Sequence, residues 1–332
     1  MFPLPRSFQG AQALLQEILY IIADNDNRNS HGSRNTSFWS KKQKETSGLP
    51  APYLANFQTF PRPDFPDYLC VMLKETLINA VEAGSKVLVH YFQDKNLQIS
   101  NKTGVNNLVT EADHASEKAI IDTIKESFPD HFILSEEVGE IVMDSTYKWI
   151  IDPIDGTVNY AHGIPICCVS IALEYEGKMV LGAVHNPFMK ELFLAERGQG
   201  ATLNGEQIFV SSQTEVDKAC LVTGFPYTYL DQPNGPLEAF GRFVRRGIAV
   251  RRLGSAALDL CWVAAGRFDG FYEHLLNAWD SAAGFLIVEE AGGKVTDFSG
   301  NPYSPYQPHI LATNGKIHDE MLLWINDKKN VQ

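Results

Sequence analysis

The sequence has few cysteines, no long apolar runs and little positive charge. Its 332 residues include five cysteines and no Cys-x-x-Cys pair, which excludes a disulfide framework and a cysteine zinc site and fits a reducing compartment. No apolar run reaches the roughly 18 residues of a membrane span. The 28 lysines and arginines are outnumbered by 40 acids, so a surface that coats nucleic acid is excluded. We therefore expect a cytoplasmic protein with no membrane or nucleic-acid partner.

The first 65 residues differ in composition from the rest. Apolar side chains recur at helical spacing from Leu14 to Ile22, which predicts a short amphipathic helix. Residues 24–50 then contain one aliphatic residue, Leu49, and such a stretch cannot bury enough apolar surface to offset its ordering entropy. We therefore predict a poorly ordered N-terminal extension over residues 1–65. Its few arginines are not typical of a transit peptide, although organellar targeting stays an open alternative.

Residues 66–328 are predicted to form one folded domain, in which helices precede strands. Helical periodicity and cap residues predict helices from Pro66 to about Phe92, from Thr110 to Pro129, over 256–265 and over 281–291. Short apolar runs predict strands over 147–152, 166–175, 179–186 and 192–195, with a hairpin turn at 176–178. This order of elements predicts sheets and helices stacked in layers.

The clearest chemical signal is the segment from Trp149 to Thr157, which reads Trp-Ile-Ile-Asp-Pro-Ile-Asp-Gly-Thr. A predicted strand carries Asp152 to its carboxyl end, and Asp155 follows so closely that both carboxylates can converge on one point. Gly156 lets the backbone approach a ligand, and the amides after it can hold a phosphate. Two carboxylates this close repel each other unless they share a cation or a proton.

Other acids stand where apolar elements begin or end. Asp113 lies in a first helical turn, Glu136 follows an apolar run, and Asp280 stands where the predicted 281–291 helix begins. Each one taken alone is typical of a helix cap or a solvated loop, and spacing does not decide whether they meet. Because no Cys or His stands at metal-ligand spacing in these stretches, a set of oxygen ligands would favour Mg²⁺.

Four sequence blocks, in this order, carry a family resemblance. They are Asn107-Leu-Val-Thr-Glu-Ala-Asp113, Ser135-Glu136-Glu137, Trp149 to Asn159, and Asn277-Ala-Trp-Asp280-Ser-Ala-Ala-Gly284 with Glu290-Ala-Gly-Gly293. From about Pro66 to Asp327 the sequence resembles the inositol monophosphatase family of Mg²⁺-dependent, lithium-sensitive phosphatases. The resemblance implies a homodimer and the α/β layered sandwich (α-β-α-β-α) that this family shares with fructose-1,6-bisphosphatase.

The resemblance also implies a set of site residues, each carried over to its matching position. Residues at the family's metal positions are Glu136, Asp152, Ile154 through its carbonyl, Asp155 and Asp280. Catalytic residues by this match are Asp113 and Thr157, which orient the attacking water, and Glu136 at the first metal. Residues at substrate positions are Lys102, Asp155, Gly156, Thr157, Gly254, Ser255, Ala256, Glu273 and Asp280. The pattern departs from the family at Asn107, where many members carry Asp, and this is expected to weaken a loosely held metal.

The function implied by this match is Mg²⁺-dependent hydrolysis of a small phosphorylated polyol by a metal-activated water, with myo-inositol monophosphate as the expected substrate. Glu273 fits a polyol contact, and no basic cluster indicates a second phosphate. Histidinol phosphate and other small sugar or nucleotide phosphates are alternatives within the family. A phosphatase with an aspartyl nucleophile would need Asp-x-Asp, which is absent around Asp152. The non-enzyme alternative is a metal-binding interaction protein.

Overall fold

The computed structural model describes residues 67–93, 99–103, 107–226 and 235–326, all of which belong to one unit of the chain, Gln58–Gln332. The predicted N-terminal extension, residues 1–65, lies outside these described residues. Of the helices that the structure does describe, none is both long and apolar enough to cross a membrane.

The large sheet holds eight strands within the described residues, in the spatial order β10, β9, β8, β7, β6, β5, β3, β4. They are β3 (Phe132–Ser135), β4 (Gly139–Ile141), β5 (Tyr147–Asp155), β6 (Cys168–Tyr175), β7 (Lys178–Asn186), β8 (Glu191–Glu196), β9 (Gly200–Leu203) and β10 (Glu206–Gln207). The predicted hairpin is confirmed by β6 and β7, which pair antiparallel. By contrast β3 runs parallel to β5, so the carboxyl ends of these two strands lie at the same edge of the sheet.

Two long helices, α3 (Asp67–Tyr91) and α4 (Glu111–Ser127), pack against one face of the large sheet. Both were expected from the helical periodicity, and Thr110 caps α4 in a capping box with Asp113 as predicted. The two helices approach closely at Gly84, where a Cβ atom would lie 2.8 Å from Ile120 Cδ1. The short pair β1 (Ile99–Thr103) and β2 (Asn107–Thr110) precedes α4.

The second half of the described chain builds a smaller sheet with helices on both faces. Its strands are β11 (Cys220–Thr223), β12 (Ala249–Arg251), β13 (Gly270–His274), β14 (Lys294–Thr296) and β15 (His309–Thr313). Its helices are the 3₁₀ turn η2 (Val216–Lys218), α6 (Pro236–Arg245), α7 (Ala256–Ala264), α8 (Ala278–Glu290) and α9 (His318–Asn326). Helices α7 and α8 contact strands of both sheets, whereas α6 and α9 contact each other and the small sheet.

The helix predicted over residues 281–291 is present as α8, but its predicted start at Ser281 is wrong. Helix α8 begins three residues earlier, at Ala278, because Asn277 is its N-cap and Asp280 is the third residue of its first turn. The Asn277 backbone N–H donates to Asp280 Oδ2 at 2.6 Å, which satisfies one of the free amides at the helix start. Asp280 therefore lies inside the helix.

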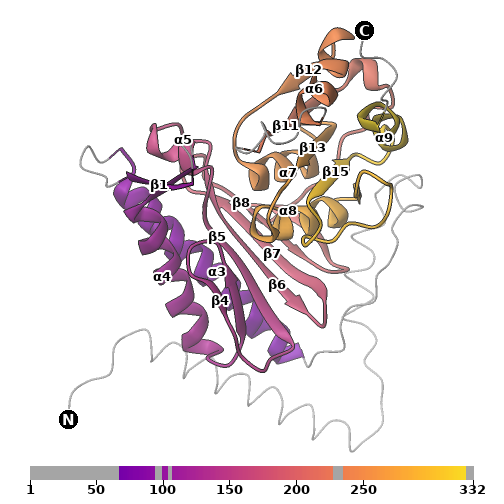
Figure 1. The fold of residues 1–332 in the computed structure, drawn as a ribbon. Coiled ribbons are helices and arrows are strands. Elements are labelled where there is room, and N and C mark those ends of the chain that lie inside the picture. Colours follow the sequence, from indigo (N-terminus) through magenta and orange to yellow (C-terminus); the bar gives the residue numbers. More distant parts are fainter. Residues whose placement is uncertain (1–66, 94–98, 104–106, 227–234, 327–332) are drawn as a thin grey trace, which may run out of the picture. The chain divides into compact units, whose positions relative to one another are not determined.

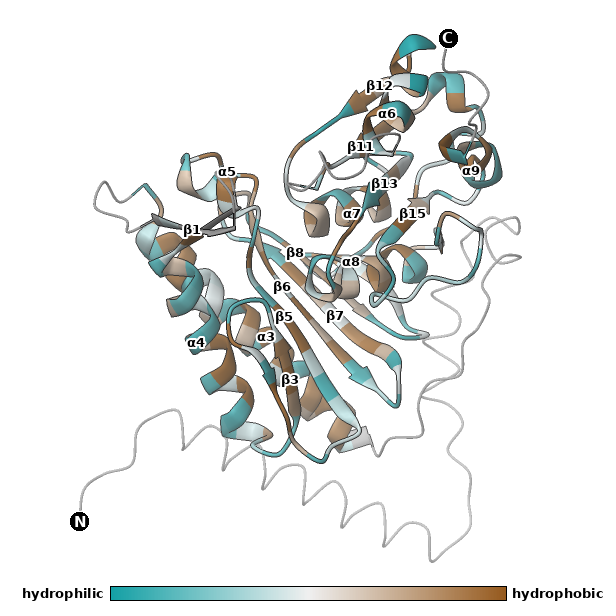
Figure 2. Cartoon of the chain, viewed as in Figure 1, coloured by the Kyte–Doolittle hydropathy of each residue, from teal (hydrophilic) through white to brown (hydrophobic). Residues whose placement is uncertain are grey.

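The layers follow as α3 and α4, the large sheet, α7 and α8, the small sheet, then α6 and α9, and Figure 1 shows this succession. The predicted α/β layered sandwich is confirmed. Apolar side chains fill the spaces between layers, as in the buried clusters around Leu77 and Trp149, around Leu260 and Ile287, and around Phe243 and Tyr272. In Figure 2 the strands β5, β6 and β7 are brown along the middle of their length, since both of their faces are covered.

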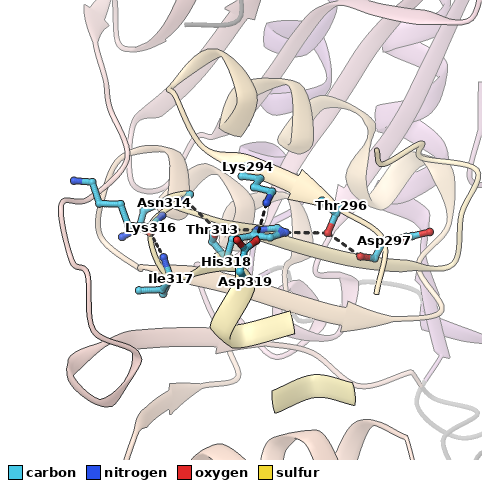
Figure 3. Close-up of polar contacts among 10 residues, drawn as sticks. Lys294, Thr296, Asp297, Thr313, Asn314, Lys316, Ile317, His318 and Asp319 are labelled. Carbon is cyan, nitrogen blue, oxygen red and sulfur yellow. Dashed lines mark hydrogen bonds and ion pairs between the residues drawn. The ribbon is translucent and has the colours of Figure 1, made fainter. Parts of the chain in front are cut away.

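The small sheet is joined to α9 by a buried histidine (Figure 3). His318, the first residue of α9, is fully buried, and its two ring nitrogens lie 2.9 Å from the hydroxyls of Thr296 on β14 and Thr313 on β15. Next to it, Lys294 Nζ donates to Asp319 Oδ1 at 2.8 Å. The polar ring atoms are therefore satisfied, as burial requires.

Candidate active site

A pocket of about 520 Å³ opens where β5 ends, beside the starts of α7 and α8. The sequence-predicted residues that line it are Glu136, Asp152, Ile154, Asp155, Gly156, Thr157, Gly254, Ser255, Ala256, Glu273 and Asp280. The parallel pairing of β3 with β5 explains the position of Glu136, whose backbone N–H donates to the carbonyl of Ile151 at 3.2 Å. The fold thus brings together side chains that are far apart in the sequence.

The acids at the end of β5 lie in a poorly solvated environment. Asp152 is almost fully buried, and its Oδ1 accepts the backbone N–H of Ile154 at 3.0 Å. Burial raises the pKa of Asp152 well above its ordinary value, and the nearby charges of Glu136, Asp155 and Asp280 raise it further. Burial likewise raises the pKa of Asp280 well above its usual range. Like charges held this close need a shared proton or a cation.

Asp155 is held by donors from the start of α7. Its Oδ2 accepts the Ser255 hydroxyl at 2.6 Å and the Ala257 backbone N–H at 2.7 Å, and the Cys168 thiol lies 3.8 Å away. Burial raises the pKa of Asp155 to about 6, against the lowering effect of these hydrogen bonds. Ser255 is itself 1% exposed, so its hydroxyl faces Asp155.

Asp113, unlike the other predicted acids, does not line the pocket: it is fully buried and contacts the lining residue Thr157. Asp113 Oδ2 accepts the backbone N–H and the hydroxyl of Thr110, while its Oδ1 lies 3.3 Å from the Thr157 hydroxyl. The same hydroxyl lies 3.0 Å from the carbonyl oxygen of Ile154. Burial raises the pKa of Asp113 to about 6. This pair can orient a hydroxylic group and accept its proton.

Gly156 turns the chain from β5 into the short helix α5 (Thr157–Ala161). Its φ is 91°, and a Cβ atom there would lie 2.8 Å from the carbonyl oxygen of Ile166 and 3.1 Å from that of Gly254. Only glycine fits both this backbone angle and this close approach. The turn leaves the first amides of α5 at the pocket, where an anion can be bound.

Glu273, at the far end of the pocket, is the predicted polyol contact. It lies on β13 and is 8% exposed, and burial raises its pKa to about 8. Lys102 lies on β1, and its side chain is outside what the structure describes.

Among the lining residues that sequence reasoning missed are two charged ones, Arg252 and Asp259. Asp259 follows Ser255 by four residues on α7, so helical spacing could have identified it as a residue on the same face. Arg252 directly precedes the Leu-Gly-Ser segment, and this adjacency was its only sequence signal.

The acids of the pocket have the chemistry of a hard-cation site. In the described residues, no group of three or more His, Cys, Asp or Glu side chains is already arranged to hold a metal ion. Glu136 and Asp152 instead share a hydrogen bond with each other. Their oxygen ligands, and those of Asp155 and Asp280, nevertheless fit Mg²⁺ better than zinc, and a cation would relieve the repulsion that raises these pKa values.

Comparison with known proteins gives consistent matches over most of the chain. A family model described as "Inositol monophosphatase family" matches residues 72–328. An "Inositol-1-monophosphatase" of Synechocystis is 46% identical over 225 residues, which are 68% of this chain and 78% of the relative. A "Nus factor SuhB" of Escherichia coli is 41% identical over 258 residues, 77% of this chain and 96% of the relative. The solved structure of an inositol monophosphatase from Anabaena (Nostoc) superposes with a TM-score of 0.68 at 41% identity, covering 76% of this chain and 96% of that chain.

Proposed function

Because the chain belongs to the inositol monophosphatase family, we propose that it hydrolyses inositol monophosphate to inositol and phosphate with Mg²⁺ as its cofactor. The observation that carries the proposal is the convergence of Glu136, Asp152, Asp155 and Asp280 on one pocket beside Thr157. The name of the Synechocystis relative supports the choice of substrate. A homodimer and a cytoplasmic location stay predictions.

The metal would be held by the carboxylates of Glu136, Asp152, Asp155 and Asp280 and by the carbonyl of Ile154. When bound, Mg²⁺ supplies positive charge that stabilises the phosphate in the transition state and lowers the pKa of water. Hydrolysis of a phosphate monoester is among the slowest uncatalysed reactions, so charge stabilisation must supply most of the acceleration.

Asp113 and Thr157 would orient the attacking water. The Thr157 hydroxyl can donate to Asp113 Oδ1, and its oxygen can then accept a hydrogen bond from water in the pocket. With a pKa of about 6, Asp113 is ready to take up a proton at Oδ1 through Thr157 near neutral pH. Its Oδ2 is already occupied by the two donors of Thr110, which fixes the direction of Oδ1.

The substrate would lie with its phosphate against the first amides of α5, after Gly156, and with its alcohol toward Glu273. Gly254 and Ala256, whose backbone lines the pocket, would border the alcohol. Arg252 is the one Lys or Arg among the described residues that line the pocket, which does not favour a second phosphate. Lys102 on β1 stays a predicted substrate contact.

The test is phosphate release from inositol 1-phosphate and histidinol phosphate, measured with Mg²⁺, with chelator and with added lithium. We expect Mg²⁺-dependent, lithium-sensitive release from inositol 1-phosphate. Asp152→Asn, which keeps the volume of the side chain, should stay folded and lose at least about 100-fold in kcat, as expected for a preorganised electrostatic contact. Added Mg²⁺ should not restore it.

Release from histidinol phosphate instead would keep the mechanism and change the substrate. Wild-type turnover by Asp152→Asn would contradict the metal assignment. If the folded protein releases no phosphate from any of these substrates, a non-catalytic role would be favoured.

A further inference from the structure

Asp259 is a buried acid that the proposed reaction does not use. It lies in the first turn of α7, is 1% exposed and lines the pocket. Its Oδ1 has no hydrogen-bond partner among the residues that the structure describes. An unpaired buried oxygen of this kind is uncommon and destabilises the fold until a donor reaches it.

Glu273 is the acid whose charge acts most strongly on Asp259. In the described part of the chain, no side chain or backbone amide forms a hydrogen bond with the Glu273 carboxylate either. Its position is fixed by packing, because a Cβ atom on Gly224 would lie 2.1 Å from Glu273 Oε1. Two acids from different elements, β13 and α7, thus line one pocket, interact through their charges and have no hydrogen-bond donors among the described residues.

Arg252 is a cation whose charge acts on both acids. Its charge opposes the rise in pKa of both Asp259 and Glu273. It is an exposed side chain, and no ion pair of 4.0 Å or less joins it to either acid within the described residues. Hydrogen bonds to these two carboxyls must therefore come from a molecule bound in the pocket.

We propose that Asp259 is a specificity-determining residue that, together with Glu273, binds hydroxyl groups on the alcohol portion of the substrate. The inference rests on the proposed function and adds a residue, Asp259, that distinguishes an alcohol with several hydroxyls from one without them. A hydroxyl can donate to one carboxyl and accept from a protonated one, so it matches either protonation state of the pair. An ester without hydroxyls leaves both acids unpaired, and a site of this kind discriminates strongly against it.

The experiment compares kcat/KM for inositol 1-phosphate with kcat/KM for p-nitrophenyl phosphate, an ester whose alcohol has no further hydroxyl. Asp259→Leu replaces the carboxyl with an apolar side chain of similar size, which has no hydrogen-bonding atoms. We expect it to lower kcat/KM for inositol 1-phosphate at least about 10-fold, mainly through KM, because one buried hydrogen bond to the substrate is lost. Turnover of p-nitrophenyl phosphate should stay within about twofold of wild type.

Asp259→Asn keeps hydrogen-bonding atoms, and we expect only a small loss, about threefold, confined to inositol 1-phosphate. It serves as the readout if the leucine variant does not fold. The matched control is Glu174→Gln, a buried carboxyl on β6 whose partners are Tyr306 and Lys148, which should leave the ratio of the two substrates unchanged.

Parallel losses on both substrates in the Asp259 variants would overturn the proposal in favour of a structural role, and so would unchanged kinetics on both. Failure of the proposed function is a separate outcome, since the wild-type protein would then release no phosphate from inositol 1-phosphate.

Discussion

At the scale of single residues, the site acids divide their two oxygens between the fold and the pocket. Asp113, Asp155 and Asp280 each use Oδ2 to accept a backbone N–H, from Thr110, Ala257 and Asn277 respectively. Each Oδ1 is left for other partners. The carboxylates are thus oriented before any ligand binds, which is what electrostatic preorganisation requires.

The Ser255 hydroxyl provides a test of this division. Because it donates to Asp155 Oδ2, we expect Ser255→Ala to raise the Mg²⁺ concentration needed for half-maximal activity about 10-fold, the effect of one lost hydrogen bond to a charged group. The KM for substrate should change less than twofold. The measurement is a Mg²⁺ titration of phosphate release at saturating substrate.

Ser85→Ala is the matched control, since its buried hydroxyl donates to the Val81 carbonyl on α3. A rise in substrate KM with an unchanged Mg²⁺ requirement would contradict this role for Ser255. It would support the direct substrate contact that the family resemblance implies.

The site residues differ in how far the sequence alone could predict them. Asp152 and Asp155 were identifiable because a predicted strand runs directly into them. No spacing rule relates them to Asp280, which reaches the pocket only through the packing of α8 on the large sheet, and family resemblance supplied that link. Asp259 carried no motif, and its spacing of four residues from Ser255 was the one sequence signal that placed it on the same helix face.

At the scale of elements, long local patterns were predicted well and short non-local ones were missed. Helices α3 and α4 have several turns of apolar periodicity, and α4 also has a recognisable cap, so their prediction was confirmed. The strands of the small sheet, such as β11 and β14, span three to four residues and pair with segments distant in sequence. Strands this short carry too little alternation to be identified alone. The start of α8 was placed too late because Asn277 was not identified as its cap.

The buried contact between α9 and the small sheet predicts an acid-sensitive element. Burial lowers the pKa of His318 to about 4, whereas the unfolded chain titrates near 6.5. The unfolded state therefore binds more protons between these values, and stability is complete above pH 6.5 and falls as the pH drops toward 4. The loss from this group is at most about 3 kcal/mol.

We expect His318→Asn to reduce this acid-side loss, measured as the difference in the free energy of urea unfolding between pH 7 and pH 4.5. The slope should not vanish, since burial also lowers the pKa of His131 and His274 to about 4. His162→Asn, at an exposed position, is the control and should leave the slope unchanged. An equal slope in the His318 variant and wild type would refute the assignment.

At the scale of the whole described unit, the site acids predict how stability depends on pH and metal together. Burial raises the pKa values of Asp113 and Asp155 to about 6 and that of Glu273 to about 8. At these three acids, the folded, metal-free protein therefore binds more protons than the unfolded chain between about pH 4 and pH 8. The stabilisation of the folded state that comes from protonating these acids is fully present below pH 4, and it is lost as the pH rises from 4 to 8.

Mg²⁺ should reverse this loss by replacing the protons. We expect the rise in Tm produced by Mg²⁺ over chelator to grow steadily from pH 5 to pH 8. Comparing the two conditions at each pH cancels the contribution of the histidines. Asp152→Asn should abolish most of the increase, and a Tm gain independent of pH would contradict the metal assignment.

The pocket also joins segments that are distant along the chain. Glu136 follows β3, Asp152 and Asp155 lie near the end of β5, and Asp280 lies in the first turn of α8. A cation bound by all of them would therefore join the large sheet to the helix layer packed on it. Such a cation would act as a cross-link that exists only after both layers have assembled, much as a structural metal closes a long loop. Scarcity of magnesium would then loosen α8 from the sheet as well as slow turnover, and cofactor supply would set how much of the chain survives proteolysis in the cell.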